Sequence, residues 1–387
     1  MDQIRHRLAS FNLRKYSMFI ALVAIMIFFQ LLTHGILLKP INISKMVMQN
    51  SYVLILAIGM LPCILTGNVD LSVGSVLGFI SAVAGTLTIS MGYPVWVTIV
   101  VALLIGLAVG AWQGFWIAYV RVPAFIVTLS GMLIFKGLTM VILNGNTLAP
   151  FPKSYGIVSS QYLPQIKIGN LDVLTMGLGL LCAVVVVLLD VKRRQKAAKY
   201  SHNPETTGWF IGKVAVKAVV ILFCCYWLAL YRGLPLVLLL LLALIVFYTF
   251  ITQNTVIGRN IYAFGGNESA AKLAGINTNR VFFLTYLNMG LMAAVAGIIF
   301  SGRLNAASPT AGTGFELDAI AACYIGGASA SGGIGTIIGA VIGGLVMGVL
   351  NNGMSIMSIG IDWQQAIKGL VLLLAVAFDI YSRRKSR

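Results

Sequence analysis

Long apolar segments alternate with short polar ones along nearly all of the 387-residue chain. A helix crosses a lipid bilayer with about 20 mainly apolar residues. Twelve segments fit this length, a few only just, and they predict an all-α polytopic membrane protein with one transmembrane domain over residues 1–387. The predicted spans are residues 18–38, 47–66, 71–90, 94–119, 124–143, 171–190, 214–230, 234–252, 281–301, 317–332, 335–352 and 364–381.

The composition supports a membrane protein and argues against nucleic acid as a partner. Hydrophobic residues make up 59% of the chain and charged residues 10%, and the mean hydropathy is +0.94. Soluble proteins carry about 25% charged residues. The net charge of +17 lies in the short segments between apolar runs, and no basic helix interleaved with aromatic residues is present for phosphate and base contacts. We therefore expect no nucleic-acid binding.

The distribution of basic residues predicts the orientation in the membrane. Loops on the cytoplasmic side carry more Lys and Arg than loops on the other side. If both termini are cytoplasmic, 19 basic residues lie on that side and six on the other. We therefore expect cytoplasmic N and C termini, with residues 258–280 in the cytoplasm.

Neither a catalytic constellation nor a metal site emerges from the sequence. The five cysteines fall in apolar segments without a CxxC pair, the three histidines are scattered, and no HExxH or cofactor motif occurs. Only ten acidic residues are present, which is few for a carrier driven by protons or sodium. We expect no enzyme activity and no cofactor in this chain, and an energy source outside it.

Residues 258–280 form the longest polar run in the second half of the chain. Asn267 is placed to cap a short helix, Glu268 suits its first turn, and Gly275 suits its end. Two interpretations of this run stay open. In one, the short helix inserts into a groove of a partner through its small-residue surface; in the other, the run is an ordinary solvated loop. The residues expected on that surface are Ala270, Ala271, Leu273 and Ala274.

Two further segments differ from plain spans. Asp70, between Gly, Asn and Ser at a membrane boundary, fits a helix cap formed by Asp70 or Ser72, or a functional carboxylate near hydrocarbon. Residues 306–335 are too rich in Gly, Ser and Pro for a smooth helix, and a span interrupted at Gly326 and Gly327 would line a cavity. The alternative is a loop that leads into a short, tightly packed helix, with the acids as caps.

Small residues also recur at every fourth position, which lets helices approach closely inside a membrane. The repeats are Gly106–Gly110–Gly114, Gly335–Gly339–Gly343 and Gly344–Gly348.

Several of these stretches together resemble the permease subunits of bacterial ABC importers for ribose, xylose and related monosaccharides. The similarity runs from about residue 45 to 381, with the motifs in the same order, and is strongest to the longer xylose and multiple-monosaccharide branch. The motifs are GNVDLSVGS (67–75), VPAFIVTLSGM (122–132), GRNIYAFGGNESAAKLAGIN (258–277), PTAGTGFELDAIAACYIGGAS (309–329) and NNGMS (351–355).

The resemblance implies import of a monosaccharide such as xylose, galactose or arabinose across a bacterial inner membrane, which the chain crosses several times. A periplasmic sugar-binding protein delivers the sugar, a cytoplasmic double-cassette ATPase binds ATP and Mg, and a second permease copy completes a homodimer. Shorter members of the family have about ten spans, so residues 171–230 resemble an inserted helix pair. Residues 258–280 correspond to the coupling loop, with ATPase contacts expected at Gly266, Asn267, Glu268, Ala270, Ala271, Leu273, Ala274 and Gly275.

Polar residues in or near the spans are the pathway or gate candidates, and each of them also fits a cap or an interhelical hydrogen bond. They are Asn68, Asp70, Glu316, Asp318, Asn351 and Asn352. The competing hypothesis for the whole chain is a stand-alone secondary carrier or facilitator for a small solute. A third is a membrane enzyme that acts on lipid or polyprenyl substrates, for which no polar catalytic motif is found.

Overall fold

The computed structural model describes residues 13–169, 171–200 and 207–384. The basic residues Arg5 and Arg7 near the N-terminus, and Lys385 and Arg387 near the C-terminus, lie outside the described residues. The chain divides into two compact units. Unit 1 comprises residues 1–37, 46–160 and 237–387, and unit 2 comprises residues 38–45 and 161–236.

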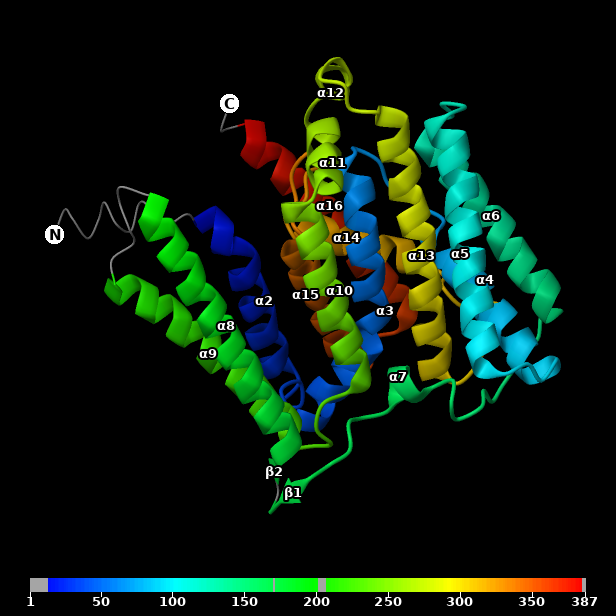
Figure 1. The fold of residues 1–387 in the computed structure, drawn as a ribbon. Coiled ribbons are helices and arrows are strands. Elements are labelled where there is room, and N and C mark those ends of the chain that lie inside the picture. The colour runs from blue at the N-terminus through cyan, green and yellow to red at the C-terminus, as the bar shows by residue number, and fades with distance from the viewer. Residues whose placement is uncertain (1–12, 170, 201–206, 385–387) are drawn as a thin grey trace. The chain divides into compact units, whose positions relative to one another are not determined.

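The predicted all-α architecture is confirmed for the described part of the chain (Figure 1). Nine of its helices are long and apolar enough to cross a membrane, and Met18–Leu32 forms a shorter apolar helix. A helix is found at each of the twelve predicted spans. Their bounds are α2 Leu13–Leu32, α3 Pro40–Leu65, α4 Val73–Gly85 with the π-helical turn η1 Thr86–Ser90, α5 Val95–Ala118, α6 Ala124–Leu143, α8 Val173–Tyr200, α9 Thr207–Ala229, α10 Leu236–Asn254, α13 Thr278–Leu304, α14 Phe315–Ile325, α15 Ile337–Ile356 and α16 Ile361–Arg384.

One of the predicted spans is wrong as drawn. The segment 317–332 holds only the 11-residue helix α14, which is about 16 Å long at 1.5 Å per residue and cannot cross about 30 Å of hydrocarbon. The helix ends at Gly326, and Gly327 has φ +82°, a backbone conformation that favours glycine. The predicted interruption at this glycine pair is therefore confirmed, and α14 is a half-helix.

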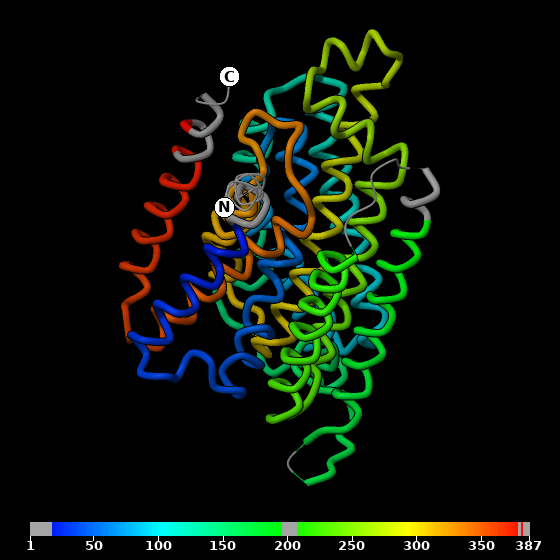
Figure 2. Tube along the Cα trace, turned by 90° about the vertical axis from the view of Figure 1, so that its left-hand side faces the viewer, coloured from blue at the N-terminus to red at the C-terminus, as the bar shows by residue number. Residues whose placement is uncertain are grey.

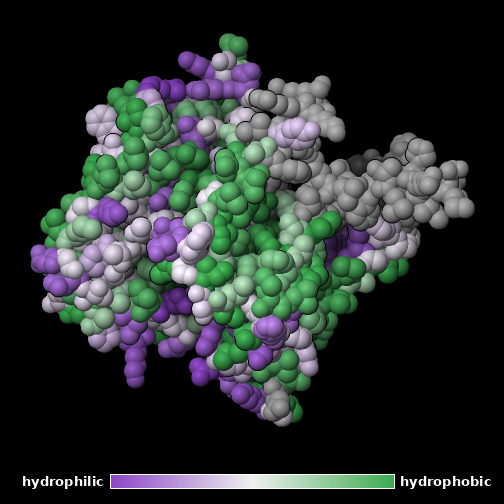
Figure 3. All heavy atoms as spheres, turned by 180° about the vertical axis from the view of Figure 1, so that it is seen from behind, coloured by the Kyte–Doolittle hydropathy of each residue, from purple (hydrophilic) through white to green (hydrophobic). Residues whose placement is uncertain are grey.

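The most buried helices of unit 1 are α3 and α15, followed by α4 and α13. α2, α15 and α16 share an apolar cluster that includes Leu22, Phe29 and Leu350, and Figure 2 shows α2 and α16 together on one side of unit 1. Hydrophobic residues cover much of the face shown in Figure 3. Large apolar side chains are exposed on α10 as well, for example Phe247 and Phe250. A surface of this kind is suited to lipid or to a partner within the membrane.

The glycine repeats mark close helix contacts, as predicted. A Cβ atom at Gly110 of α5 would lie 2.5 Å from the Tyr286 carbonyl oxygen of α13. A Cβ atom at Gly343 of α15 would lie 1.9 Å from the Ala322 carbonyl oxygen of α14. Only glycine allows these backbones to touch, so the half-helix α14 is held tightly against α15.

Unit 2 contains α8 and α9, which pack on each other, and a two-stranded antiparallel sheet of β1 Lys167–Ile168 and β2 Leu171–Asp172. The buried Asp172 carboxylate accepts hydrogen bonds from the backbone N–H groups of Ile166 (2.9 Å) and Thr175 (3.3 Å) at the start of α8. The predicted inserted helix pair, residues 171–230, falls within this unit. Its status as an insertion stays a prediction.

Candidate functional site

A short helix projects at one end of unit 1, in the polar run that the sequence marks as unusual (Figure 1). It is α12, Glu268–Leu273, and it follows α11, Val256–Gly266. The Asn267 side chain accepts a hydrogen bond of 2.9 Å from the Ala270 N–H, and Gly275 has φ +83° just after the helix. The predicted cap and the predicted stop are both confirmed. The part of the predicted loop before the cap is itself helical.

Of the residues expected on the exposed surface around α12, only Ala271 is buried. Leu273 is 90% exposed at its tip, although it is the largest apolar residue of this helix. Ala271 is 4% exposed and packs against the protein, so it does not lie on the exposed surface of α12, and its contact with a partner stays a prediction. The helix is too short to be held by its own hydrogen bonds, and Ala271 is the side chain that packs it down. The other expected contact residues are exposed: Gly266, Asn267, Glu268, Ala270, Ala274 and Gly275.

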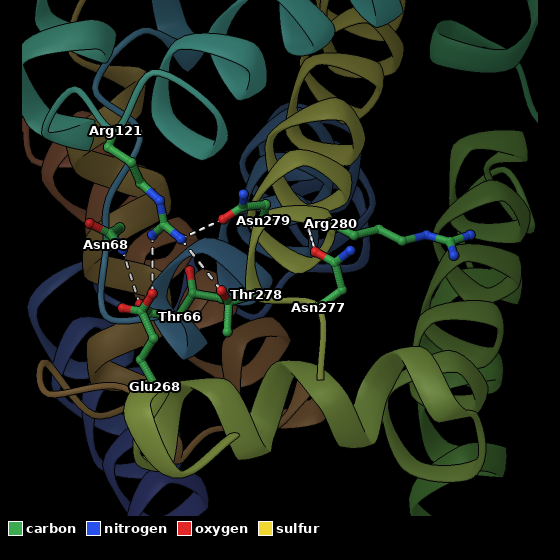
Figure 4. A network of polar contacts seen from close by, with 8 residues as sticks. All are labelled: Thr66, Asn68, Arg121, Glu268, Asn277, Thr278, Asn279 and Arg280. Carbon is green, nitrogen blue, oxygen red and sulfur yellow. Dashed lines mark hydrogen bonds and ion pairs between the residues drawn. The ribbon is translucent and has the colours of Figure 1, made fainter. Parts of the chain in front are cut away.

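Arg121, which the sequence did not single out, fixes α12 to the rest of its end of unit 1 (Figure 4). It lies in the α5–α6 connection, and its guanidinium forms an ion pair of 3.1 Å with the Glu268 carboxylate. The same guanidinium donates to the Thr278 hydroxyl at 3.4 Å and to the Asn279 side-chain oxygen, both in the first turn of α13. An exposed pair of this kind adds about 0–1 kcal/mol. Its main effect is to orient α12 relative to α5 and α13.

A second connection leads from α11 into the glycine-rich segment, residues 326–336, between α14 and α15. The Gly333 N–H donates to the Leu65 carbonyl at the end of α3, at 2.9 Å. A Cβ atom at Gly265 of α11 would lie 1.7 Å from the same Leu65 carbonyl oxygen and 2.6 Å from the Gly333 nitrogen. The Tyr262 hydroxyl donates to the Gly335 carbonyl at 2.7 Å. Figure 2 shows this segment, in orange, at the same end as α12.

Asp70 lies between α3 and α4 and is 2% exposed. Its carboxylate accepts bonds from the Ser72 N–H (2.8 Å) and hydroxyl (2.6 Å), and the Ser72 hydroxyl accepts one from the Gln113 amide of α5 (2.7 Å). The predicted cap is wrong, because Asp70 bonds Ser72, which is the N-cap residue, and neither side chain accepts a hydrogen bond from the first helical N–H groups of α4. Burial raises the pKa of Asp70 to about 6, although the Ser72 hydrogen bonds oppose this rise.

Half-helix α14 places two acids in its first turn, and they have different surroundings. Asp318 is 2% exposed and forms an ion pair of 3.0 Å with Lys368 of α16, and the Asn351 amide of α15 lies next to the same carboxylate. Glu316 is half-buried and lies against the start of α4, because a Cβ atom at Gly74 would be 2.4 Å from its carboxylate oxygen. A carboxylate at that position suits the dipole of α4.

The six pathway candidates therefore fall into separate groups. Asp318 and Asn351 come together with Lys368, which the sequence did not single out as a candidate. Asn68 donates to the Thr66 carbonyl in its own loop, at 3.0 Å, and Asn352 is buried in α15. Whether any of the six lines a passage stays a prediction. No metal-binding group of three His, Cys, Asp or Glu residues occurs in the described part of the chain.

The architecture of unit 1 is that of a polytopic transport protein. Apolar helices form a bundle, the half-helix α14 lies inside it, and the short helix α12 is held at one end by Arg121. The chain belongs to the family described as "Branched-chain amino acid transport system / permease component", which it matches over residues 42–376. It is accordingly a multi-pass permease of the inner membrane.

Curated relatives agree over almost the whole chain. The xylose transport system permease protein XylH of Escherichia coli (strain K12) is 42% identical over 379 residues, 98% of this chain and 95% of the relative. XylH of Haemophilus influenzae is 40% identical, over 98% of this chain and 99% of the relative. The ribose import permease protein RbsC of E. coli (strain K12) is 35% identical, over 87% of this chain and 85% of the relative. The resemblance seen in the motifs is thereby confirmed. No solved structure matches the chain.

Proposed function

We propose that this chain is the membrane-spanning subunit of an ATP-driven importer of monosaccharides, with xylose as the first candidate substrate. The observation that carries the proposal is the α12 end of unit 1, where a capped helix with an exposed Leu273 is clamped by Arg121. The substrate follows from the relatives, since the xylose permease is 42% identical and the ribose permease 35%.

The partner at this end is a cytoplasmic ATPase with two nucleotide cassettes, which binds the ATP and Mg. A groove of about 300 Å³ lies between α11 and α13, the two helices that α12 connects. Its lining combines exposed apolar residues, Val256 and Ile257, with the polar Asn277 and Arg280. An apolar anchor beside a groove with a polar rim is typical of a protein interface. Leu273 and this groove together form the proposed contact.

The mechanism is alternating access driven from the α12 end. Because Gly265 touches Leu65 and Gly333, and Tyr262 bonds Gly335, a displacement of α11 and α12 reaches α3 and the glycine-rich segment directly. That segment joins the half-helix α14 to α15, so the displacement is passed into the interior of unit 1. Such coupling needs two arrangements with different contacts, and the ATPase selects between them.

The transport pathway is formed by two copies of the chain, and a periplasmic binding protein delivers the sugar. The sequence has no internal duplication, so one chain supplies one half of a symmetric pathway. Selectivity then resides largely in the binding protein.

The deciding experiment is co-purification of the tagged chain in mild detergent with the proteins encoded beside it. We expect a double-cassette ATPase to co-purify and to be lost in Leu273→Asp. Ile168→Asp is the matched control, because Ile168 is also an exposed apolar residue (72%) but lies in β1. A partnerless chain that still moves sugar in liposomes would instead establish the stand-alone carrier.

The substrate is tested with proteoliposomes that hold the assembled complex. We expect uptake of labelled xylose that depends on ATP and on the binding protein. Excess galactose, arabinose and ribose then rank the alternatives by competition. If none of the four sugars is taken up, the monosaccharide assignment fails.

A further inference from the structure

A small cavity with a mixed apolar and polar lining lies between α4, α6 and the segment that leads into α14. Its volume is about 80 Å³, enough for a few water molecules. Met132 and Leu133 of α6 form an apolar part of the wall, and five other lining residues are polar. The polar residues are Ser75, Lys136, Thr139, Thr313 and Glu316.

The position of Lys136 indicates that this cavity has a functional role. It is the one charged residue of α6, a 20-residue apolar helix, and it lies about 18 Å from the first residue of the helix. Its side chain is exposed, and the ion pairs of the described residues do not include it. A bare ammonium group is costly against lipid, so charged residues in spans face water or protein. We therefore expect the open side of the cavity to face water or protein.

The opposite charge comes from Glu316, which lines the same cavity. One basic and one acidic residue in the same lining give it no net formal charge. Lysine offers only hydrogen-bond donors, an ionised glutamate only acceptors, and the Ser and Thr hydroxyls both. A sugar hydroxyl needs a donor and an acceptor together, which this lining supplies.

We infer that this cavity is a sugar-binding station on the transport path, where Lys136 and Glu316 hydrogen-bond the hydroxyl groups of the passing monosaccharide. The inference rests on the proposed function. At about 80 Å³ the cavity admits one edge of a sugar ring, and the rest of the sugar lies in the water-filled passage outside it. Lys136, Ser75 and Thr139 stand on spanning helices, whereas Glu316 stands on half-helix α14.

The station is therefore linked to the α12 end. Glu316 is the second residue of α14, and the other end of α14 leads into the glycine-rich segment, which bonds Tyr262. A displacement of α14 changes the separation of Glu316 from Lys136. The station then holds sugar in one arrangement and releases it in the other.

Accessibility of position 136 is the first test. In proteoliposomes with the assembled complex, Lys136→Cys is treated with a membrane-impermeant, water-soluble thiol reagent, with and without xylose. Peptide mass spectrometry separates position 136 from the five native cysteines. We expect modification that xylose slows. Leu138→Cys is the matched control, because Leu138 is exposed on the same helix but does not line the cavity, and we expect it to stay unmodified.

Uptake is the second test, and it uses Lys136→Met and Glu316→Gln. We expect each to lower xylose uptake by about tenfold, the effect of losing one charge-assisted hydrogen bond to the substrate, with the ATPase still bound. An unreactive cysteine at 136, or normal uptake in both variants, overturns the station. If a zwitterionic amino acid such as leucine slows the modification of the cysteine at position 136 and xylose does not, the ligand of the station is not a sugar. Failure of the unsubstituted complex to take up any sugar is a separate result that overturns the proposed function.

Discussion

The Tyr262 hydroxyl donates a hydrogen bond of 2.7 Å to the backbone carbonyl of Gly335, 73 residues further along the chain. Tyr262 belongs to the helix that precedes α12, and Gly335 belongs to the segment that joins α14 to α15. This bond is the one side-chain hydrogen bond that the described residues form between these two segments, beside their backbone packing. Under the proposed mechanism this bond contributes to coupling, and a variant that lacks only the hydroxyl oxygen tests that contribution.

Tyr262→Phe removes that hydroxyl and leaves the ring. One hydrogen bond is worth about 0.5–1.5 kcal/mol, so we expect the sugar moved per ATP hydrolysed to fall by about 2- to 10-fold. Uptake and ATP hydrolysis are measured together in proteoliposomes. Tyr93→Phe, at an exposed tyrosine of the α4–α5 connection, serves as the control. Equal ratios in both variants would remove the bond from the coupling route.

Gly265→Ala and Gly266→Ala form a matched pair of neighbours in α11. A Cβ atom at Gly265 would overlap the Leu65 carbonyl oxygen at 1.7 Å, whereas nothing lies within 4 Å of one at Gly266. Overpacking costs about 1–3 kcal/mol, so we expect Gly265→Ala to lower the melting temperature in detergent and to impair transport. Gly266→Ala should melt like the unsubstituted chain. Similar melting of the two variants would contradict the close contact of α11 with α3.

The Asp318–Lys368 pair predicts a strong non-additivity between substitutions. Lys368→Met leaves the buried Asp318 carboxylate without its partner, which costs about 3–5 kcal/mol. Adding Asp318→Asn removes that charge, and we expect the double variant to regain most of the stability. Thermal melting of the two single variants and the double variant completes the cycle. Additive losses would mean that the two side chains do not interact.

Asp70 predicts a specific dependence of stability on pH. Burial raises its pKa from 3.8 to about 6 in the folded protein. Its contribution to stability is therefore complete below pH 3.8 and is lost as the pH rises through about 6, a loss on the order of 3 kcal/mol. Asp70→Asn keeps an oxygen that accepts the Ser72 bonds but cannot ionise.

We expect Asp70→Asn to melt higher than the unsubstituted chain above pH 6, with a gap that closes as the pH falls toward 4. Melting curves between pH 4 and 7.5 measure the gap. A constant gap across that range would show that the carboxyl does not titrate there. Lost transport in a stable Asp70→Asn variant would support the pathway role.

Local sequence patterns were enough to locate the helices of this protein and the ends of α12, but not the contacts between distant segments. A helix is found at each predicted span, because a long apolar run is a signal that depends only on residues close together in the sequence. Asn267 and Gly275 located the ends of α12, because a cap and a left-handed stop depend only on neighbouring residues.

Contacts between distant segments were decided only by the tertiary structure. The Arg121–Glu268 pair joins residues 147 positions apart, and no local pattern relates them. Ala271 appeared equivalent to Ala270 in the sequence, yet packing buries the first and exposes the second, because a one-residue step turns the side chain by about 100° around a helix. Lys136 was an isolated charge within a span until α14 brought Glu316 to the same cavity. Sequence periodicity fixes which face of a helix is apolar, but only the packed bundle determines which polar side chains meet.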